Sequence, residues 1–300
     1  MITHPQNPSA RVLLFSLKGS IIPSIWRKVL FTTVLSSLVV ATHGTLYHYK
    51  VTLTATPFTL WGLTLAIFLG FRNSVAYQRF WEARTLWGEL LISARNLTRQ
   101  VQQFFPQLDR EERLYLLQPL LAYPYAMRNF LRDVIYENTN RIADDEVKRQ
   151  LHAPSLMLAT LGKRVTEYAR LSKLDPIMLA QMDTQINQLS HVLGGCERIK
   201  STPIPYPYIL MLHRVVHVYC FLLPFCLVDS IGWLTPVAVC ILAYTFFGLD
   251  ALGDQISDPF GTEPNDLPLD AMSRNIEIAV LEMLDEPLPP ALQAQEGVLL

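Results

Sequence analysis

The stretch that decides the fold is Pro57–Trp87, which reads PFTLWGLTLAIFLGFRNSVAYQRFWEARTLW. Its first half, Pro57–Phe71, carries no charged residue. Its second half brings Arg72, Arg79, Glu82 and Arg84, with no proline or glycine to end a helix. The first half would make a helix about 22 Å long, whereas the hydrocarbon core of a bilayer is about 30 Å thick. If this helix spans a membrane, its charged continuation begins at or inside the membrane boundary, where cationic side chains must reach water or protein.

Within this predicted helix, Leu63, Ile67 and Phe71 recur at every fourth position. Residues four apart lie on one face, so these side chains form a row with steps of about 6 Å along the axis. Repeated around a symmetry axis, the row would give stacked apolar rings. Taken by itself, the pattern favours a helix packed into the core of a bundle. Gly62 and Gly70 offer places where neighbouring helices can approach closely.

The segment LAIFLGFRNSVAYQRFWEARTLWGEL, residues 65–90, resembles the second transmembrane helix of the bestrophin family, particularly its bacterial branch. The glycine–aromatic pair Gly70–Phe71 and the run Arg79–Trp81 both match the family pattern. The resemblance implies a homopentameric ion channel in which the row Leu63–Ile67–Phe71 forms the hydrophobic neck and gate. An apolar neck offers an ion no ligands, so conduction would depend on whether the constriction stays wet.

The composition indicates a membrane protein with a substantial soluble part. Half of the 300 residues are hydrophobic and 17% are charged, against about 25% charged residues in an ordinary soluble domain. The net charge of −1 argues against a nucleic-acid partner, which would select a basic excess. The cysteines lack metal-finger spacing, and we expect small buried side chains rather than a disulfide framework: Cys196, Cys220, Cys226 and Cys240.

Four apolar segments predict an all-α fold in which four transmembrane helices continue into a cytoplasmic helical bundle. These segments are Val29–Tyr47, Pro57–Phe71, Tyr206–Val228 and Trp233–Leu249. Ser24 is expected to cap the first helix, and Pro106 to end the second near Phe105. Amphipathic helices are expected over 109–134, capped by Asp109, and over 154–171, 175–193 and 271–284, with a polar loop at 136–144. Gly194–Gly195 is expected to end the third of these helices.

This reading divides the chain into five parts. They are a cytoplasmic N-terminal segment (1–28), transmembrane helices 1 and 2 with a cytoplasmic extension (29–105), a cytoplasmic helical region (106–205), transmembrane helices 3 and 4 (206–254) and a cytoplasmic tail (255–300). Basic residues are concentrated just before the first span and just after the second span. The positive-inside rule therefore predicts a multi-pass membrane protein with both termini in the cytoplasm. The resemblance to the bacterial branch of the family implies that this membrane is the bacterial inner membrane.

Two further segments carry the family resemblance. Thr202–Tyr206 resembles the entry into the third span, where the residue matching Ile204 narrows the cytoplasmic aperture; without the family, Ile204 is an apolar residue in a rigid loop. The turn Pro259–Gly261 matches a turn that in animal members precedes a calcium-clasping acidic run. Here the corresponding positions are Gln255, Asp258, Glu263 and Asp266, and the acidic run is broken by Pro264 and Asn265. Calcium takes about six to eight oxygen ligands, so we expect a solvated acidic loop and no required cofactor.

Nothing in the sequence indicates an enzyme. His213 and His217 have a spacing that can share a metal, but we favour a polar face turned into the bundle or a wet cavity. Asp250 and Asp254 are expected to pair with Arg72, Arg79 or Arg84. Phosphate-binding and nucleophile motifs do not occur.

The sequence leaves three functions open. The first is the pore-forming subunit of a channel that passes small monovalent ions, with other copies of the chain, the lipid bilayer and the ions as its partners. The second is a non-conducting membrane scaffold or regulatory protein, and the third is a secondary transporter. The family contains both anion-conducting and cation-conducting members, so the resemblance permits chloride or cation conduction.

Overall fold

The computed structural model describes residues 16–17, 19–42, 45–46, 49–50, 55–134, 152–295 and 297–299. The polar loop expected at 136–144 lies outside these residues. The chain divides into two compact units. The apolar unit comprises the described residues up to Phe80 together with Pro203–Asp258, and the polar unit comprises Trp81–Thr202 with the described residues from Pro259 onward.

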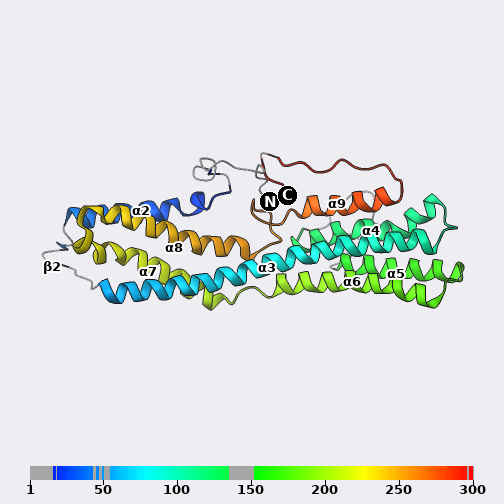
Figure 1. Ribbon diagram of the computed structural model, residues 1–300, viewed down its shortest axis with the longest axis horizontal. Helices are drawn as coiled ribbons and strands as arrows, with labels where there is room; N and C mark the ends of the chain where they lie inside the picture. Colours follow the sequence, from blue (N-terminus) through cyan, green and yellow to red (C-terminus); the bar gives the residue numbers. More distant parts are fainter. Residues whose placement is uncertain are drawn as a thin grey trace. The chain divides into compact units, whose positions relative to one another are not determined.

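The apolar unit is a bundle of long helices (Figure 1). Its elements are α2 (Ile22–Ala41), the first part of α3 (Ala55–Phe104), α7 (Tyr206–Ile231), the 3₁₀ turn η2 (Gly232–Leu234) and α8 (Thr235–Ser257). Between α2 and α3, β1 (Thr45–Leu46) pairs antiparallel with β2 (Tyr49–Lys50), with Thr45 opposite Lys50. α2 lies along α8, and α7 packs against both helices. Most of the described residues of the apolar unit are thus helical, in agreement with the predicted class.

The prediction that Ser24 caps the first helix is wrong. α2 begins at Ile22, and the side-chain oxygen of Ser20 accepts a hydrogen bond from the Ile22 N–H over 3.1 Å. Pro23 lies in the first turn, where its missing N–H costs nothing because no intrahelical acceptor exists there. The helix therefore starts before Trp26, Arg27 and Lys28 and carries these residues in its first two turns.

Among its described residues, the polar unit contains the rest of α3 together with α4 (Arg110–Leu131), α5 (Ala153–Leu171), α6 (Pro176–Ser201) and α9 (Leu269–Met283). α4 contacts α5 and α9, and α5 contacts α6. The predicted cap of α4 is confirmed: the Glu112 N–H donates to the Asp109 carboxylate over 2.8 Å, and the Asp109 N–H donates to the Glu112 carboxylate over 3.1 Å. This reciprocal capping box satisfies two N–H groups that a helix start would otherwise leave without partners.

The prediction that Gly194–Gly195 ends a helix is wrong, because α6 continues to Ser201. At Gly195 a Cβ atom would lie 2.8 and 2.9 Å from the two methyl groups of Leu86 on α3. Within the polar unit, this glycine therefore lets α6 pack closely against α3 instead of terminating the helix.

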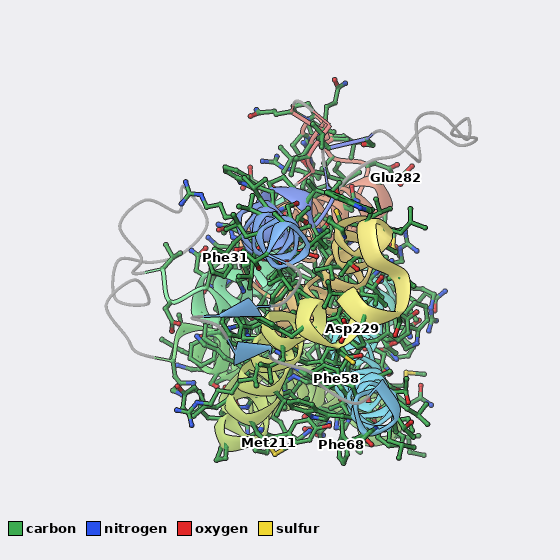
Figure 2. The ribbon with its side chains drawn as sticks, turned by 90° about the vertical axis from the view of Figure 1, so that its left-hand side faces the viewer. Phe31, Phe58, Phe68, Met211, Asp229 and Glu282 are labelled. Carbon is green, nitrogen blue, oxygen red and sulfur yellow. The ribbon has the colours of Figure 1, made fainter. Side chains whose placement is uncertain are left out.

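By length and composition, three helical segments of the described chain could cross a membrane: Ile22–Ala41, Thr56–Phe104 and Tyr206–Ser257. The third segment comprises α7, η2 and α8. Large apolar side chains accordingly lie on the outside of the apolar unit, and Figure 2 labels Phe31, Phe68 and Met211 among them. All four cysteines are free, as expected, and burial raises the pKa of the Cys196 thiol.

Candidate ion pathway

The row predicted to form the neck lies on the surface of its own chain. Leu63, Ile67 and Phe71 on α3 are 60%, 48% and 62% exposed. Side chains in a bundle core would be almost fully covered, so the row takes no part in the core of this chain. Gly70, next to Phe71, also faces open space, because a Cβ atom added there would meet nothing within 4 Å.

The opposite face of the same helix is the part that packs. Leu65 and Leu69 are buried in a cluster with residues of α7 and α8, including Val216 and Val239. Gly62 belongs to this face, since a Cβ atom there would lie 3.0 Å from the Cζ atom of Tyr219 on α7. Because glycine has no side chain, α3 can pack closely against α7 at this position.

A buried charge cluster fixes α3 to α8 just beyond the apolar row. Arg72 is 1% exposed, and its Nη1 atom donates to Asp250 over 2.6 Å, while its Nη2 atom donates to Asp254. Of the three arginines that the sequence offered as partners, the structure selects Arg72. Arg79 instead donates from Nε to the backbone carbonyl of Ser257 over 3.2 Å. A guanidinium buried this deeply needs such partners, because an uncompensated charge inside the protein is costly.

Neighbouring residues adapt to this cluster. The Asn73 side-chain amide donates to the backbone carbonyl of Leu249 over 3.0 Å, so it points to α8, whereas Ser74 is exposed. A Cβ atom at Gly253 would collide with the side-chain oxygen of Asn73 and lie 3.4 Å from Nε of Arg72. Gly253 therefore allows α8 to approach α3 closely enough for the ion pairs to form.

The two histidines of α7 lie against different polar partners. The Nδ1 atom of His213 lies 2.6 Å from a carboxylate oxygen of Asp250, and Nδ1 of His217 lies 2.7 Å from the backbone carbonyl of His213. Sequence reasoning missed the link between His213 and Asp250, because it grouped the histidines with each other by their spacing.

The spacing of donor atoms alone would permit a metal here: atoms of His213, Asp250 and Asp254 lie within 4.8 Å of one another. Both carboxylates already receive N–H groups from the Arg72 guanidinium, which supplies the positive charge in place of a metal ion. The arrangement is therefore an ion-pair network of Arg72 with two carboxylates, and His213 lies within hydrogen-bond distance of one of them.

The remaining predicted site residues fall in both units. Ile204 is 7% exposed in the apolar unit, where Gln255 is half-buried and Asp258 exposed. Glu263 and Asp266 belong to the polar unit, where the Asp266 carboxylate accepts a hydrogen bond from the Glu263 N–H over 2.7 Å. The Asp266 N–H in turn donates to the Glu263 carbonyl over 3.0 Å. One carboxylate oxygen of Asp266 is thus satisfied by a hydrogen bond within its own turn, and it needs no bound cation.

The chain is mostly helical, and it combines long apolar helices with an apolar surface row and a buried ion-pair network. These features define a helical integral membrane protein. Residues 1–282 match the family described as "Bacterial/Fungal Bestrophin protein". The "Voltage-dependent anion channel-forming protein mll4386" of Mesorhizobium japonicum is 37% identical, over 99% of this chain and 96% of its own. The "Voltage-dependent anion channel-forming protein YneE" of Escherichia coli (strain K12) is 37% identical, over 97% of this chain and 96% of its own.

A solved structure agrees with these relatives. The crystal structure of a bacterial bestrophin homolog from Klebsiella pneumoniae superposes with a TM-score of 0.83 and 35% identity, over 88% of this chain and 99% of that one. The chain belongs to the bestrophin family, as the resemblance in the sequence implied. The family and its named relatives are ion channels rather than enzymes, in agreement with the sequence-based expectation.

Proposed function

We propose that the chain is the pore-forming subunit of a bestrophin-like channel that passes small monovalent ions through a hydrophobic neck. The observation that carries the proposal is the exposure of Leu63, Ile67 and Phe71 on α3, opposite the face that packs against α7. A surface row of this kind on a membrane-length helix can meet other copies of the chain, lipid or an aqueous pore. The relatives that form channels favour the pore.

The neck would act through its wetting. Apolar side chains give an ion no replacement for its hydration shell, so a wide neck conducts as a column of water and a narrow neck dewets and closes. Gly70 supports this role, because its open surroundings leave space beside Phe71. Opening and closing would then follow from small changes in the spacing of the α3 helices around the axis.

Five copies of the chain would form the ring, with α3 of each copy on the axis. The apolar unit has too few long helices to enclose a pore by itself, and a closed ring requires a heterologous interface that repeats around the axis. Native mass measurement of the protein in mild detergent should give a homopentamer. A dominant monomer or dimer would contradict the pore.

We further propose that α2, α3, α7 and α8 each cross the membrane and that both termini are cytoplasmic. Gly232, with φ of +48°, makes the sharp connection after α7 that a return through the membrane requires. Arg27 and Lys28 at the start of α2 and Arg79 and Arg84 on α3 are expected to face the cytoplasm. Protease protection of inside-out vesicles should leave α4–α6 accessible; their protection would overturn this topology.

The conducted ion is proposed to be an anion, chloride in the first instance, because the named relatives are anion channel-forming proteins. An apolar neck does not itself discriminate between signs of charge. In planar bilayers with asymmetric potassium chloride, discrete current steps should reverse near the chloride equilibrium potential. Reversal near the potassium equilibrium potential would show cation conduction, and silence in varied salts and pH would support a scaffold.

Ile204 is proposed to bound the cytoplasmic exit, as the family resemblance implies. Within one chain its side chain is largely covered, so its effect on the exit would come through the position of the rigid Thr202–Tyr206 loop. Ile204→Ala should change conductance less than alanine at Ile67. A larger change at Ile204 would indicate that the narrowest point of the pathway lies at the exit rather than at the neck.

A further inference from the structure

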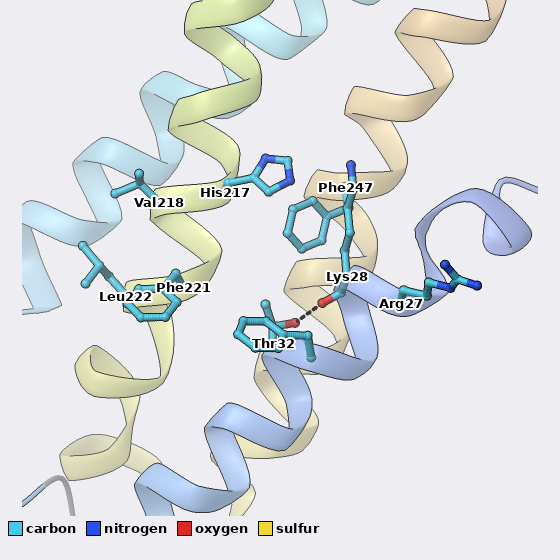
Figure 3. A pocket seen from close by; sticks show the side chains of 9 residues that line it. Arg27, Lys28, Thr32, His217, Val218, Phe221, Leu222 and Phe247 are labelled. Carbon is cyan, nitrogen blue, oxygen red and sulfur yellow. Dashed lines mark hydrogen bonds between the residues drawn. The ribbon is translucent and has the colours of Figure 1, made fainter.

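Side chains of α2, α7 and α8 line an open pocket of about 570 Å³ on the apolar unit (Figure 3). This volume lies in the range of ordinary small-molecule sites, which is about 300–1,000 Å³. Its apolar lining includes Phe31, Val218, Phe221 and Leu222. Arg27 and Lys28 also contribute to the lining, most of which is apolar, so the two cations border an apolar pocket.

The cations have no anionic partner within the described part of the chain. Nζ of Lys28 lies 5.7 Å from the ring centroid of Phe247, and Cζ of Arg27 lies 5.5 Å from that of Trp26. Among the described residues, neither side chain forms a hydrogen bond or ion pair with another residue. Figure 3 shows Lys28 extending beside Phe247, across the pocket from His217, whereas the Arg27 guanidinium points away from His217. Aromatic rings hold both cations in place without neutralising their charge.

The apolar part is open to the surroundings of the chain. Phe31 is 61% exposed and Phe221 46% exposed. The hydroxyl of Thr32, at the base of the pocket, donates to the backbone carbonyls of Lys28 and Val29, so it is satisfied within its own helix. A ligand that fills this part therefore gains little from polar groups and much from hydrocarbon.

We propose that the pocket binds an anionic phospholipid, with the headgroup phosphate at Lys28 and Arg27 and an acyl chain along Phe31, Phe221 and Leu222. Charge complementarity selects an anionic over a zwitterionic headgroup, because each basic residue near an anionic membrane surface contributes about a fivefold increase in affinity. The inference uses the proposed membrane topology, in which Arg27 and Lys28 face the cytoplasm. Its readout is binding, so it can succeed or fail independently of conduction.

The test is native mass spectrometry of the full-length, delipidated protein offered dioleoyl phosphatidylglycerol or dioleoyl phosphatidylcholine. We expect the wild-type protein to retain phosphatidylglycerol preferentially. Lys28→Gln and Arg27→Gln should each weaken its binding about fivefold, and the double variant should remove the preference. The matched control is Arg214→Gln, which removes an exposed cation of α7 outside the pocket and should leave the preference unchanged.

Val218→Trp keeps both cations and fills the apolar part, so it should also lower phosphatidylglycerol binding, which provides a second route if the charge variants assemble poorly. Inorganic phosphate should not displace the lipid, since it lacks the acyl chain. Equal retention of the two lipids, or equal losses in Lys28→Gln and Arg214→Gln, would overturn the proposal. Efficient cross-linking of Phe221→Cys to a neighbouring copy would also overturn it, because a second chain would then occupy the pocket.

Discussion

On α3, Leu65 and Leu69 are 2% and 0% exposed, whereas Ile67 and Phe71, each two positions further along, are 48% and 62% exposed. The four side chains have similar size and hydrophobicity, and they alternate within two turns of one helix. What separates them is direction: a shift of two residues turns a side chain about 160° around the helix. One face holds the chain together, and the other remains available for a function outside the single chain.

The comparison also explains why the helix can carry an exposed apolar row without losing its position. The buried face ends in the ion pairs of Arg72 with Asp250 and Asp254, which fix α3 to α8. Gly62 and Gly253 allow the close approach of α7 and α8 on that side. The buried face therefore determines how the exposed face is oriented, and the following predictions separate the two roles.

The largest loss of stability is expected from a substitution at Arg72. Arg72→Gln leaves the buried Asp250 carboxylate without its guanidinium, and losing one partner of a buried pair costs about 3–5 kcal/mol. Thermal unfolding in detergent should show the loss. The matched control is Arg198→Gln, which breaks the exposed pair with Glu82 and should cost less than about 1 kcal/mol. Similar losses in the two variants would mean that the charge cluster does not anchor the buried face.

The next effect is expected from the buried leucines. Leu65→Ala and Leu69→Ala should each cost about 2–5 kcal/mol, because the surrounding helices collapse only partly into the space left behind. Expression and ring assembly should fall, and no current should be gained. Unchanged thermal stability in both variants would contradict the division of α3 into a packing face and a free face.

A smaller effect should distinguish the two glycines. Gly62→Ala places a methyl group against the Tyr219 ring and should cost about 1–3 kcal/mol through overpacking. Gly70→Ala meets nothing within its own chain and should not destabilise it, since alanine also favours a helix over glycine. Thermal unfolding of the dissociated subunit measures both changes. A loss at Gly70 equal to that at Gly62 would place Gly70 in the core.

The smallest effect is expected from calcium removal. Glu263 is exposed and the Asp266 carboxylate is engaged in its own turn, so a chelator should leave current and melting temperature unchanged. The control is readdition of calcium after chelation. A shift of several degrees, reversed by calcium and absent in a Glu263→Gln, Asp266→Asn variant, would show that this segment does hold the ion.

Several parts of the fold follow from local signals in the sequence. Asp109 predicts the start of α4, and Pro106 predicts the end of α3, because caps and prolines act through neighbouring backbone groups. The start of α2 was harder to place. Ser24 was expected to cap this helix, but the helix already begins at Ile22, where the Ile22 N–H donates to the hydroxyl oxygen of Ser20.

Features that depend on contacts between distant segments could not be predicted in the same way. Gly194–Gly195 has the composition of a helix end, and only the packing of Leu86 against Gly195 explains why α6 continues. The choice of Arg72 over Arg79 and Arg84 depends on the register between α3 and α8. The pairing of His213 with Asp250 joins residues 37 apart in sequence, for which no spacing rule exists. The site residues were predicted by resemblance, and their exposure came from the structure.

The most direct test of the central claim is single-channel recording of Leu63→Ala, Ile67→Ala and Phe71→Ala in planar bilayers, with Leu65→Ala as the control. If the exposed row lines the neck, truncation widens an apolar constriction and lowers its dewetting barrier. The account predicts normally assembled protein with raised conductance or open probability for the three neck variants, and a destabilised protein without a gain in current for the control. Poorly assembled, silent Ile67→Ala and Phe71→Ala proteins beside a normal Leu65→Ala protein would contradict it.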